Sequence, residues 1–337
     1  MINLLNDPSF DNTRNNLNAD LFVSNLKHTF DGFKWDTKIT YEVYRTITIY
    51  HIKWTDDKEY NDILELKREI ALALGIRTEE LKIEDTGNNS INITVDNMKR
   101  EPLSLKELLY EFKTDDSFKV PLGLNVKDEV ITFDFDKDKS LLVAGVSSSG
   151  KTNLFNSIII NLLINYSDTK IVILDSQGIN YNSYKNICEV VNKEEEIIKK
   201  IKSLRKEFED RVKSGNKDRL VVFIDEIYEI IKLDNSVDED INYLLEVGST
   251  YGIHLIVSTD SVLEDNTLRI FSNNKIAKLS FYLTSRGEYN TFIHVPVNED
   301  LNNDGMYLDS DSNLNRIIIP LIEDDEIERV VKYIEKR

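Results

Sequence analysis

Cysteine, histidine and proline are scarce in this chain of 337 residues, which contains one, four and five of them. A single thiol, Cys188, cannot build a disulfide framework. The four histidines are scattered and form no zinc-binding pattern. No apolar run approaches the roughly 20 residues of a membrane span. Residues 1–10 lack the basic flank and apolar core of a secretion signal, so we expect a cytoplasmic protein.

Positive charge is also in short supply. The chain has 60 acidic residues against 42 Lys and Arg, a net charge of −18. A protein that coats nucleic acid passively is basic, because its affinity comes from neutralised phosphates, so any nucleic-acid contact here must be local. Only residues 199–219 are basic, with nine Lys or Arg against four acids. Two interpretations stay open for them: a solvated helix face, the commoner origin of such runs, and a DNA contact.

The first third of the chain has the pattern of a leader and a small domain. Residues 1–19 are polar and rich in Asn and Asp, which predicts a loose leader. We expect residues 20–115 to form a small α+β domain, and a linker near residues 114–121 to follow it. We predict a strand or a hairpin over residues 38–53, helices over residues 61–74 and 103–112, and short strands over residues 81–85 and 91–95.

Residues 116–337 alternate short apolar runs with helical patterns, which is typical of a parallel sheet covered by helices. The predicted strands are 141–144, 170–174, 220–224, 254–258 and 277–282. The predicted helices are 151–164, 193–212 and 240–251. We therefore predict a three-layer α/β domain with a mainly parallel sheet.

Residues 145–152 match the phosphate-binding pattern G-x-x-x-x-G-K-[ST] between a predicted strand and a predicted helix. Gly145 and Gly150 allow backbone N–H groups to turn toward a phosphate, and the helix N-terminus adds partial positive charge. We expect Lys151 to reach the β- and γ-phosphates and the Thr152 hydroxyl to ligate Mg²⁺. The loop serines complete the predicted nucleotide site: Ser147, Ser148 and Ser149. The pattern predicts ATP and Mg²⁺ as ligands; the alternative is a Gly/Ser-rich loop that matches by chance.

Acidic and polar residues end the neighbouring strands, where parallel strands open onto a shared crevice. We expect Asp225 to hold the Mg²⁺ shell and Glu226 to polarise the attacking water. The alternative is an acidic helix start, since carboxylates favour helix N-termini. Thr259 and Asp260 are weaker candidates for sensing the γ-phosphate, because such residues are common at strand ends. Asp175 ends strand 170–174 and is equally ambiguous.

In order and spacing, these blocks together resemble the motor region of the FtsK/SpoIIIE DNA translocases, within the FtsK/HerA branch of P-loop ATPases. The blocks are residues 70–75, 90–97, 102–109, 121–124, 141–152, 221–226, 251–259, 305–308 and 323–334. The resemblance covers about residues 21–337. It implies a RecA-like ATPase domain preceded by the small first subdomain of the motor. It also implies a homo-oligomeric ring, expected to be a hexamer, that acts on double-stranded DNA.

Four features depart from the family pattern. Asp260 stands where the family has Gln, and residues 288–290 stand where it has Asp-Ser-Arg, so Asn290 takes the place of an arginine offered to the neighbouring subunit. Arg286 is the nearest candidate to replace it, and Arg269 a more distant one. The loop over residues 214–217 is shortened. The chain also lacks a membrane anchor and a winged-helix orienting domain, so we expect a separate loading or anchoring protein.

Three functions stay open on this evidence. The first is an ATP-driven motor for double-stranded DNA, in plasmid, phage or mobile-element transfer or segregation. The second is an ATPase for protein export, as in type VII secretion, although a single module without an anchor argues against it. The third is a nucleotide-binding assembly or regulatory subunit that hydrolyses poorly, which Asp260 and Asn290 motivate.

Overall fold

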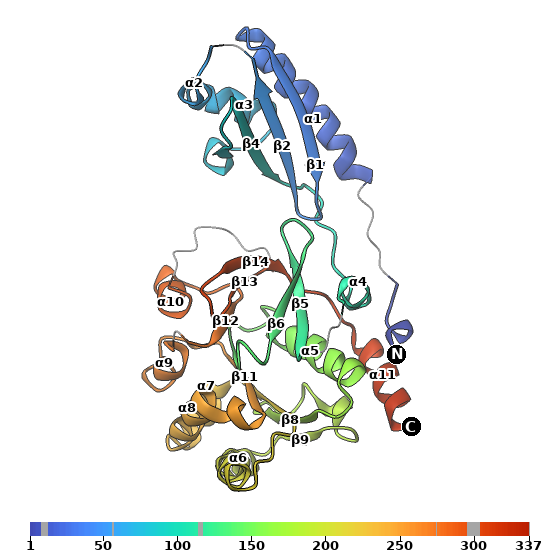
Figure 1. The fold of residues 1–337 in the computed structure, drawn as a ribbon, viewed down its shortest axis with the longest axis vertical. Helices are drawn as coiled ribbons and strands as arrows, with labels where there is room; N and C mark the ends of the chain where they lie inside the picture. Colours follow the sequence, from blue (N-terminus) through green and yellow to red (C-terminus); the bar gives the residue numbers. More distant parts are fainter. Residues whose placement is uncertain (8–12, 56, 114–116, 274, 295–303, 337) are drawn as a thin grey trace. The chain divides into compact units, whose positions relative to one another are not determined.

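Figure 1 shows the computed structural model of the chain, which describes residues 1–7, 13–55, 57–113, 117–273, 275–294 and 304–336. The backbone forms two compact units. The larger unit comprises Met1–Pro8, Leu103–Asn125 and Glu129–Arg337, and the smaller comprises Ser9–Pro102 and Val126–Asp128.

A ten-stranded sheet in the order β6-β5-β14-β13-β12-β7-β11-β10-β8-β9 forms the centre of the larger unit. Six adjacent strands are parallel: β12 (Ala277–Ser280), β7 (Leu141–Ala144), β11 (Ile253–Thr259), β10 (Leu220–Asp225), β8 (Lys170–Asp175) and β9 (Glu189–Val191). Four antiparallel strands extend the sheet beyond β12: β13 (Gly305–Leu308), β14 (Leu314–Ile318), β5 (Lys119–Asn125) and β6 (Val130–Asp134).

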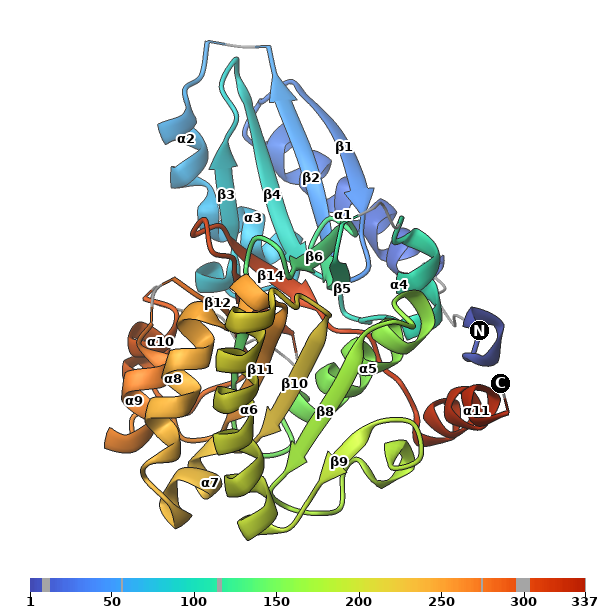
Figure 2. The same ribbon diagram turned by 60° about the horizontal axis from the view of Figure 1, so that its bottom comes forward.

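Helices cover both faces of this sheet (Figure 2). One face packs against α4 (Leu105–Glu111), α5 (Lys151–Asn165) and α11 (Asp324–Glu335). The other packs against α6 (Glu194–Ser214), α7 (Ile227–Leu233), α8 (Val237–Val247), α9 (Asp265–Phe271) and α10 (Arg286–Phe292). Successive strand residues alternate between the faces: in β10, Phe223 joins the core beneath α5 and Val222 the core beneath α6. Burial on both faces explains the continuous apolar runs, and the predicted three-layer α/β fold is confirmed.

The smaller unit has a four-stranded antiparallel sheet in the order β1-β2-β4-β3. These strands are β1 (Thr37–Val43), β2 (Ile47–Trp54), β3 (Lys82–Asp85) and β4 (Ser90–Asp96). The helices α1 (Thr13–Gly32), α2 (Tyr60–Glu65) and α3 (Lys67–Ala73) share one apolar core with the sheet. At its centre, the rings of Trp35 and Trp54 meet edge to face, with centroids 5.5 Å apart. The predicted α+β pattern of this region therefore has a core of its own.

The predicted leader over residues 1–19 is wrong for the residues that the structure describes. Residues 13–19 begin α1, whose Ala19, Leu26 and Phe30 are buried against the small sheet. Residues 1–7 pack on the larger unit, where Leu5 is buried and Arg329 Nε donates to the carbonyl of Leu4 at 2.7 Å. The sequence of α1 contains so many polar residues that its apolar residues show no clear helical spacing. Its apolar side is identified only by its packing against the small sheet. Residues 8–12 lie outside the described residues.

Several predicted boundaries also move. The predicted linker over 114–121 overlaps β5, and its residues 114–116 lie outside the described part of the chain. The predicted helix over 61–74 is divided at Leu66 into α2 and α3, and the one over 240–251 ends in a 3₁₀ turn, Gly248–Tyr251. Helix α4 contacts β5 and belongs with the larger unit, whereas the sequence placed it in the small domain. The domain boundaries at 20–115 and 116–337 stay a prediction.

Two further expectations from the sequence concern the loop before β10 and the presence of membrane-spanning helices. Helix α6 ends at Ser214 and β10 begins at Leu220, so the connection between them is short. Among the helices that the structure describes, none is both long and apolar enough to cross a bilayer.

Lys278 in β12 generates a prediction about pH and stability. The side chain is buried, its Nζ donates to the carbonyl of Phe292 at 2.6 Å, and burial lowers the pKa of Lys278 to about 8. Between pH 8 and about 10.5 the unfolded chain therefore binds more protons at this lysine than the folded chain, and the free energy of unfolding rises with pH. We expect this residue to contribute a rise of about 2–3 kcal/mol across that window.

Chemical denaturation of Lys278→Met at a series of pH values between 7 and 10.5 measures this contribution. The variant should lack the rise, whereas Lys206→Met, which removes an exposed lysine of α6, should retain it. Equal slopes in wild type and Lys278→Met would contradict the prediction.

Candidate nucleotide-binding site

The loop over residues 145–150 joins β7 to α5 and is held by the two strands beside it. The N–H of Gly145 donates to the carbonyl of Thr259 at 3.2 Å, and the N–H of Val146 donates to that of Tyr282 at 3.0 Å. Gly150 adopts a φ of +113°, which side chains rarely tolerate. A Cβ on Gly145 would lie 2.7 Å from the Cβ of Phe281. Both glycines are therefore required by the loop's own geometry, apart from any ligand.

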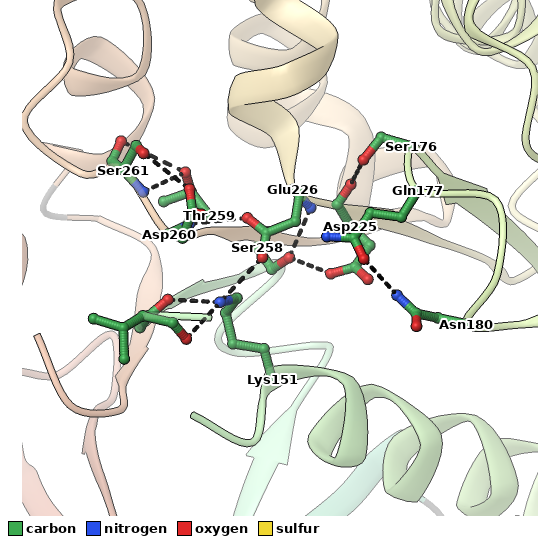
Figure 3. Close-up of polar contacts among 12 residues, drawn as sticks. Lys151, Ser176, Gln177, Asn180, Asp225, Glu226, Ser258, Thr259, Asp260 and Ser261 are labelled. Atoms are coloured by element: carbon green, nitrogen blue, oxygen red, sulfur yellow. Dashed lines mark hydrogen bonds and ion pairs between the residues drawn. The ribbon is translucent and has the colours of Figure 1, made fainter. Parts of the chain in front are cut away.

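Lys151, the first residue of α5, directs its ammonium group back into this loop (Figure 3). Its Nζ donates to the carbonyls of Gly145 at 2.6 Å and Val146 at 3.0 Å, and it lies 3.0 Å from Oε1 of Glu226. The residue is only 4% exposed, so these partners compensate the cost of burying its charge. An arriving phosphate would compete with all three for the same cation.

Asp225 ends β10 and is held at both carboxylate oxygens. The Ser258 hydroxyl donates to Oδ1 at 2.6 Å, and the Tyr181 hydroxyl donates to Oδ2 at 3.1 Å. Burial raises the pKa of Asp225, and the two hydrogen bonds oppose that effect. Each oxygen keeps a further lone pair, so the group can still accept from a metal-bound water.

Glu226 follows at the start of α7 with a φ of +54°, an uncommon conformation for a residue with a side chain. Its N–H donates to the Ser258 hydroxyl at 2.9 Å, and its Oε2 accepts from the N–H of Asp260 at 2.9 Å. Burial raises the pKa of Glu226, and the nearby Lys151 ammonium opposes the rise. The sharp turn at Glu226 directs the carboxylate toward the phosphate-binding loop, as Figure 3 shows.

The weaker sequence candidates have local roles in the structure. Thr259 is buried, and its hydroxyl accepts from the N–H of Ser261 at 3.1 Å. Asp260 contacts Glu226 through its backbone, while its side chain accepts from the Ser261 hydroxyl at 2.9 Å. The Asp175 carboxylate accepts from the N–H groups of Gly178 and Asn180, each at 3.0 Å. Asp175 therefore fixes the turn that follows β8.

The arginine candidates lie on the surface. Arg286 is the first residue of α10 and is exposed, and Asn290 is exposed on the same helix. Arg269 on α9 is exposed and lies 3.8 Å from Asp238. As predicted from the residues, Lys151, Asp225 and Glu226 lie together in the structure, whereas Arg286 lies on the surface and its role toward a neighbouring subunit stays a prediction.

The polar side chains of the phosphate-binding loop are suited to binding a nucleotide. The hydroxyl oxygen of Ser149 is buried with no hydrogen-bond partner among the described residues, and Ser147 and Ser148 are exposed beside it. The described part of the chain holds no cluster of three or more His, Cys, Asp or Glu side chains that could bind a metal. A Mg²⁺ ion at Thr152 and Asp225 would therefore need phosphate oxygens and water to complete its shell, as Mg²⁺ at nucleotides commonly does.

A pocket of about 480 Å³ lies beside Glu226. Its lining includes the polar and charged residues Ser176, Gln177, Glu194, Glu226, Glu229 and Asp260. Water can therefore reach Glu226 through this pocket, whose lining does not include Lys151.

Ser258 and Tyr181 were missed by the sequence analysis. Ser258 was assigned only as a strand residue and Tyr181 was not singled out, yet both contact Asp225. The position of Ser258, one residue before Thr259 at the end of a predicted parallel strand, was the available signal. Tyr181 carried none, because its loop gives no local pattern.

Replacing Ser258 tests how the turn at Asp225 and Glu226 is held. Ser258→Ala removes a donor to a buried carboxylate and an acceptor for the N–H of Glu226, so we expect the free energy of unfolding to fall by about 2–3 kcal/mol. Ser280→Ala is the matched control: Ser280 is buried on β12, and its hydroxyl donates to one backbone carbonyl, that of Phe281. Denaturant unfolding should show a smaller loss for the control; equal losses would refute the assigned role.

Three kinds of comparison place this geometry among known proteins. The FtsK/SpoIIIE family model matches residues 107–280. The chain is 26% identical to the DNA translocase FtsK of Staphylococcus aureus (strain Mu50) over 372 aligned positions, which cover 99% of this chain and 47% of that protein. It is 25% identical to the DNA translocase SpoIIIE of Bacillus subtilis, covering 92% of this chain and 44% of the relative. The chain thus spans about half the length of these curated relatives.

Solved structures share the fold at low identity. The pCW3 conjugation coupling protein TcpA, solved as a monomer with ATPγS, matches with a TM-score of 0.59 and 14% identity, over 94% of this chain and 99% of that one. The cytoplasmic domain of the type VII secretion ATPase EccC of Thermomonospora curvata matches with a TM-score of 0.53 and 16% identity. This match covers 69% of this chain and 34% of that one. The predicted RecA-like P-loop ATPase fold is confirmed. Because the family model covers more than half of the chain, the protein belongs to the FtsK/SpoIIIE family.

Proposed function

We propose that the chain is an ATP-driven motor that moves double-stranded DNA as a homo-oligomeric, six-membered ring. The observation that carries the proposal is the contact of Lys151 with Glu226, beside Asp225, at the carboxyl edge of the parallel sheet. The FtsK and SpoIIIE relatives, which are named DNA translocases, support the choice of DNA. Plasmid, phage or mobile-element DNA transfer or segregation is the setting that we infer.

Binding of the triphosphate would begin with an exchange of partners at Lys151. Its present partners are two neutral carbonyls and one carboxylate, and phosphate oxygens carry more negative charge than the carbonyls. The N–H groups at the start of α5 point into the same loop and favour an anion there. Nucleotide binding would therefore separate Lys151 from Glu226.

Hydrolysis would use the Glu226 carboxylate that this exchange releases. Losing the ammonium partner removes the effect that opposes the raised pKa of Glu226, so the carboxylate becomes a stronger proton acceptor. It could then orient a water that enters from the adjoining pocket. Thr152 and Asp225 would hold Mg²⁺, which when bound neutralises charge on the β- and γ-phosphates.

The basic segment over residues 199–219 is weak support for a DNA contact. Six of its nine cations form ion pairs within the chain: Lys199, Lys200, Lys202, Arg205, Arg211 and Lys213. Arg211 is also buried, and it donates to the carbonyls of Asp218 and Tyr251. These contacts favour the solvated and structural interpretation of the segment, so DNA contacts would come from other loops of a ring.

The two alternatives keep the same site. Similarity to the EccC secretion ATPase favours protein export as the second candidate, and salt-sensitive binding to DNA without sequence preference would separate the two. A poorly hydrolysing assembly subunit is supported by Asp260, whose side chain bonds to Ser261 while only its backbone contacts Glu226.

Steady-state ATP hydrolysis with and without long double-stranded DNA tests the motor. We expect DNA to stimulate turnover, and Lys151→Ala and Glu226→Gln to lose at least 100-fold of it (about 2.7 kcal/mol in the barrier). Lys232→Ala is the control, because Lys232 lines the pocket beside Glu226 and pairs with Glu229 without touching the phosphate-binding loop. Tight ATP binding with no turnover, whatever DNA is added, would instead favour the assembly subunit.

Mixed rings test whether Arg286 acts on a neighbouring subunit. An arginine supplied in trans contributes about 10³-fold or more to turnover, so Arg286→Ala should lower the rate without weakening ATP binding. Mixing Arg286→Ala with Lys151→Ala subunits should restore part of the activity, because some interfaces then combine an intact loop with an intact arginine. The same experiment with Arg269→Ala is the comparison; wild-type turnover in Arg286→Ala would exclude this residue.

A further inference from the structure

Tyr181 is fully buried at the end of the turn that follows β8. Two side chains hold this turn in place. Asp175 accepts from the N–H groups of Gly178 and Asn180 at 3.0 Å each, and the Ser176 hydroxyl donates to the carbonyl of Asp225 at 3.0 Å. Figure 3 shows the hydrogen bond from Ser176 to Asp225. The turn is thus fastened to the end of β10, and its last residue has little freedom to move.

The Tyr181 hydroxyl contacts Asp225, one of the two residues that are predicted to hold Mg²⁺. It donates to Oδ2 of Asp225 at 3.1 Å. A phenol has one proton to donate, and Tyr181 donates it to Asp225. Burial raises the pKa of Tyr181 well above its ordinary value, which keeps that proton in place.

The hydroxyl completes a chain of side chains from two neighbouring strands, β11 and β10, and from the turn that follows β8. Ser258 holds Oδ1 of Asp225 at 2.6 Å, and Tyr181 holds Oδ2 at 3.1 Å. A carboxylate held at both oxygens cannot rotate, and its remaining lone pairs point in fixed directions. Such outer contacts commonly set the affinity of a metal site as strongly as the ligands do.

We propose that Tyr181 is a positioning residue of the Mg²⁺–nucleotide site: its hydroxyl sets the Asp225 carboxylate at the geometry that Mg²⁺ requires. The inference rests on the proposed function, since it assumes that the loop binds a nucleotide with Mg²⁺. It also assigns a role to the turn over residues 175–181, because this turn, which Asp175 holds in place, positions the Tyr181 hydroxyl beside Asp225.

Tyr181→Phe removes the hydroxyl and keeps the ring that packs beside Phe155. Tyr184→Phe is the matched control, because Tyr184 is buried in the next 3₁₀ turn and its hydroxyl donates to Asn156 at 3.1 Å, away from Asp225. The affinity for a non-hydrolysable ATP analogue is measured by calorimetry in EDTA and across a series of Mg²⁺ concentrations. Thermal unfolding of both variants shows how much stability each lost hydroxyl costs.

Tyr181→Phe should need about tenfold more Mg²⁺ for its half-maximal gain in affinity, with unchanged affinity in EDTA, whereas Tyr184→Phe should follow wild type. Identical Mg²⁺ dependence in Tyr181→Phe and wild type, or an equal shift in both variants, would overturn the positioning role and leave the proposed function standing. A wild-type chain whose nucleotide affinity does not respond to Mg²⁺ would overturn the proposed site and this inference together.

Discussion

The structure depends on keeping three charged side chains, Lys151, Asp225 and Glu226, almost completely buried at one edge of a parallel sheet. A buried charge is tolerated only when nearby groups compensate it, and here each of the three has two or more partners. The ammonium of Lys151 balances one carboxylate, and the hydroxyls of Ser258 and Tyr181 solvate the other. These contacts hold the three side chains together within the fold, and under the proposed function nucleotide binding would exchange partners among them.

Strand order provides the partners. Strand β11 lies between β7, which leads into the phosphate-binding loop, and β10, which ends at Asp225. Ser258 at the end of β11 is therefore next to Asp225 and Glu226, although more than 30 residues separate them in the chain. The carboxyl end of β8 lies on the other side of β10 and supplies Tyr181. Each flanking strand thus stabilises one side of the acidic pair, as open α/β sheets allow.

The ion pairs of the fold decide how the basic segment over residues 199–219 is interpreted. A stretch with nine cations in a chain of net charge −18 left two interpretations open, a solvated helix face and a DNA contact. In the fold, Lys202 and Arg205 of α6 pair with Asp234 and Asp240, and Arg211 ties the end of α6 to the start of β10. Local composition counts charges, but only tertiary contacts show which of them are already neutralised.

The sequence by itself determined the phosphate-binding loop, the Asp225–Glu226 pair and the parallel three-layer sheet, because these depend on short spacings and on strands buried on both faces. It did not reveal α1, whose apolar side is sparse and is buried only because a sheet lies beneath it. It also did not reveal Ser258 or Tyr181 as partners of Asp225, or Glu226 as the partner of Lys151. Those contacts join residues 33 to 75 positions apart, so no local pattern encodes them; the order of the strands and the cost of burying charge decided them.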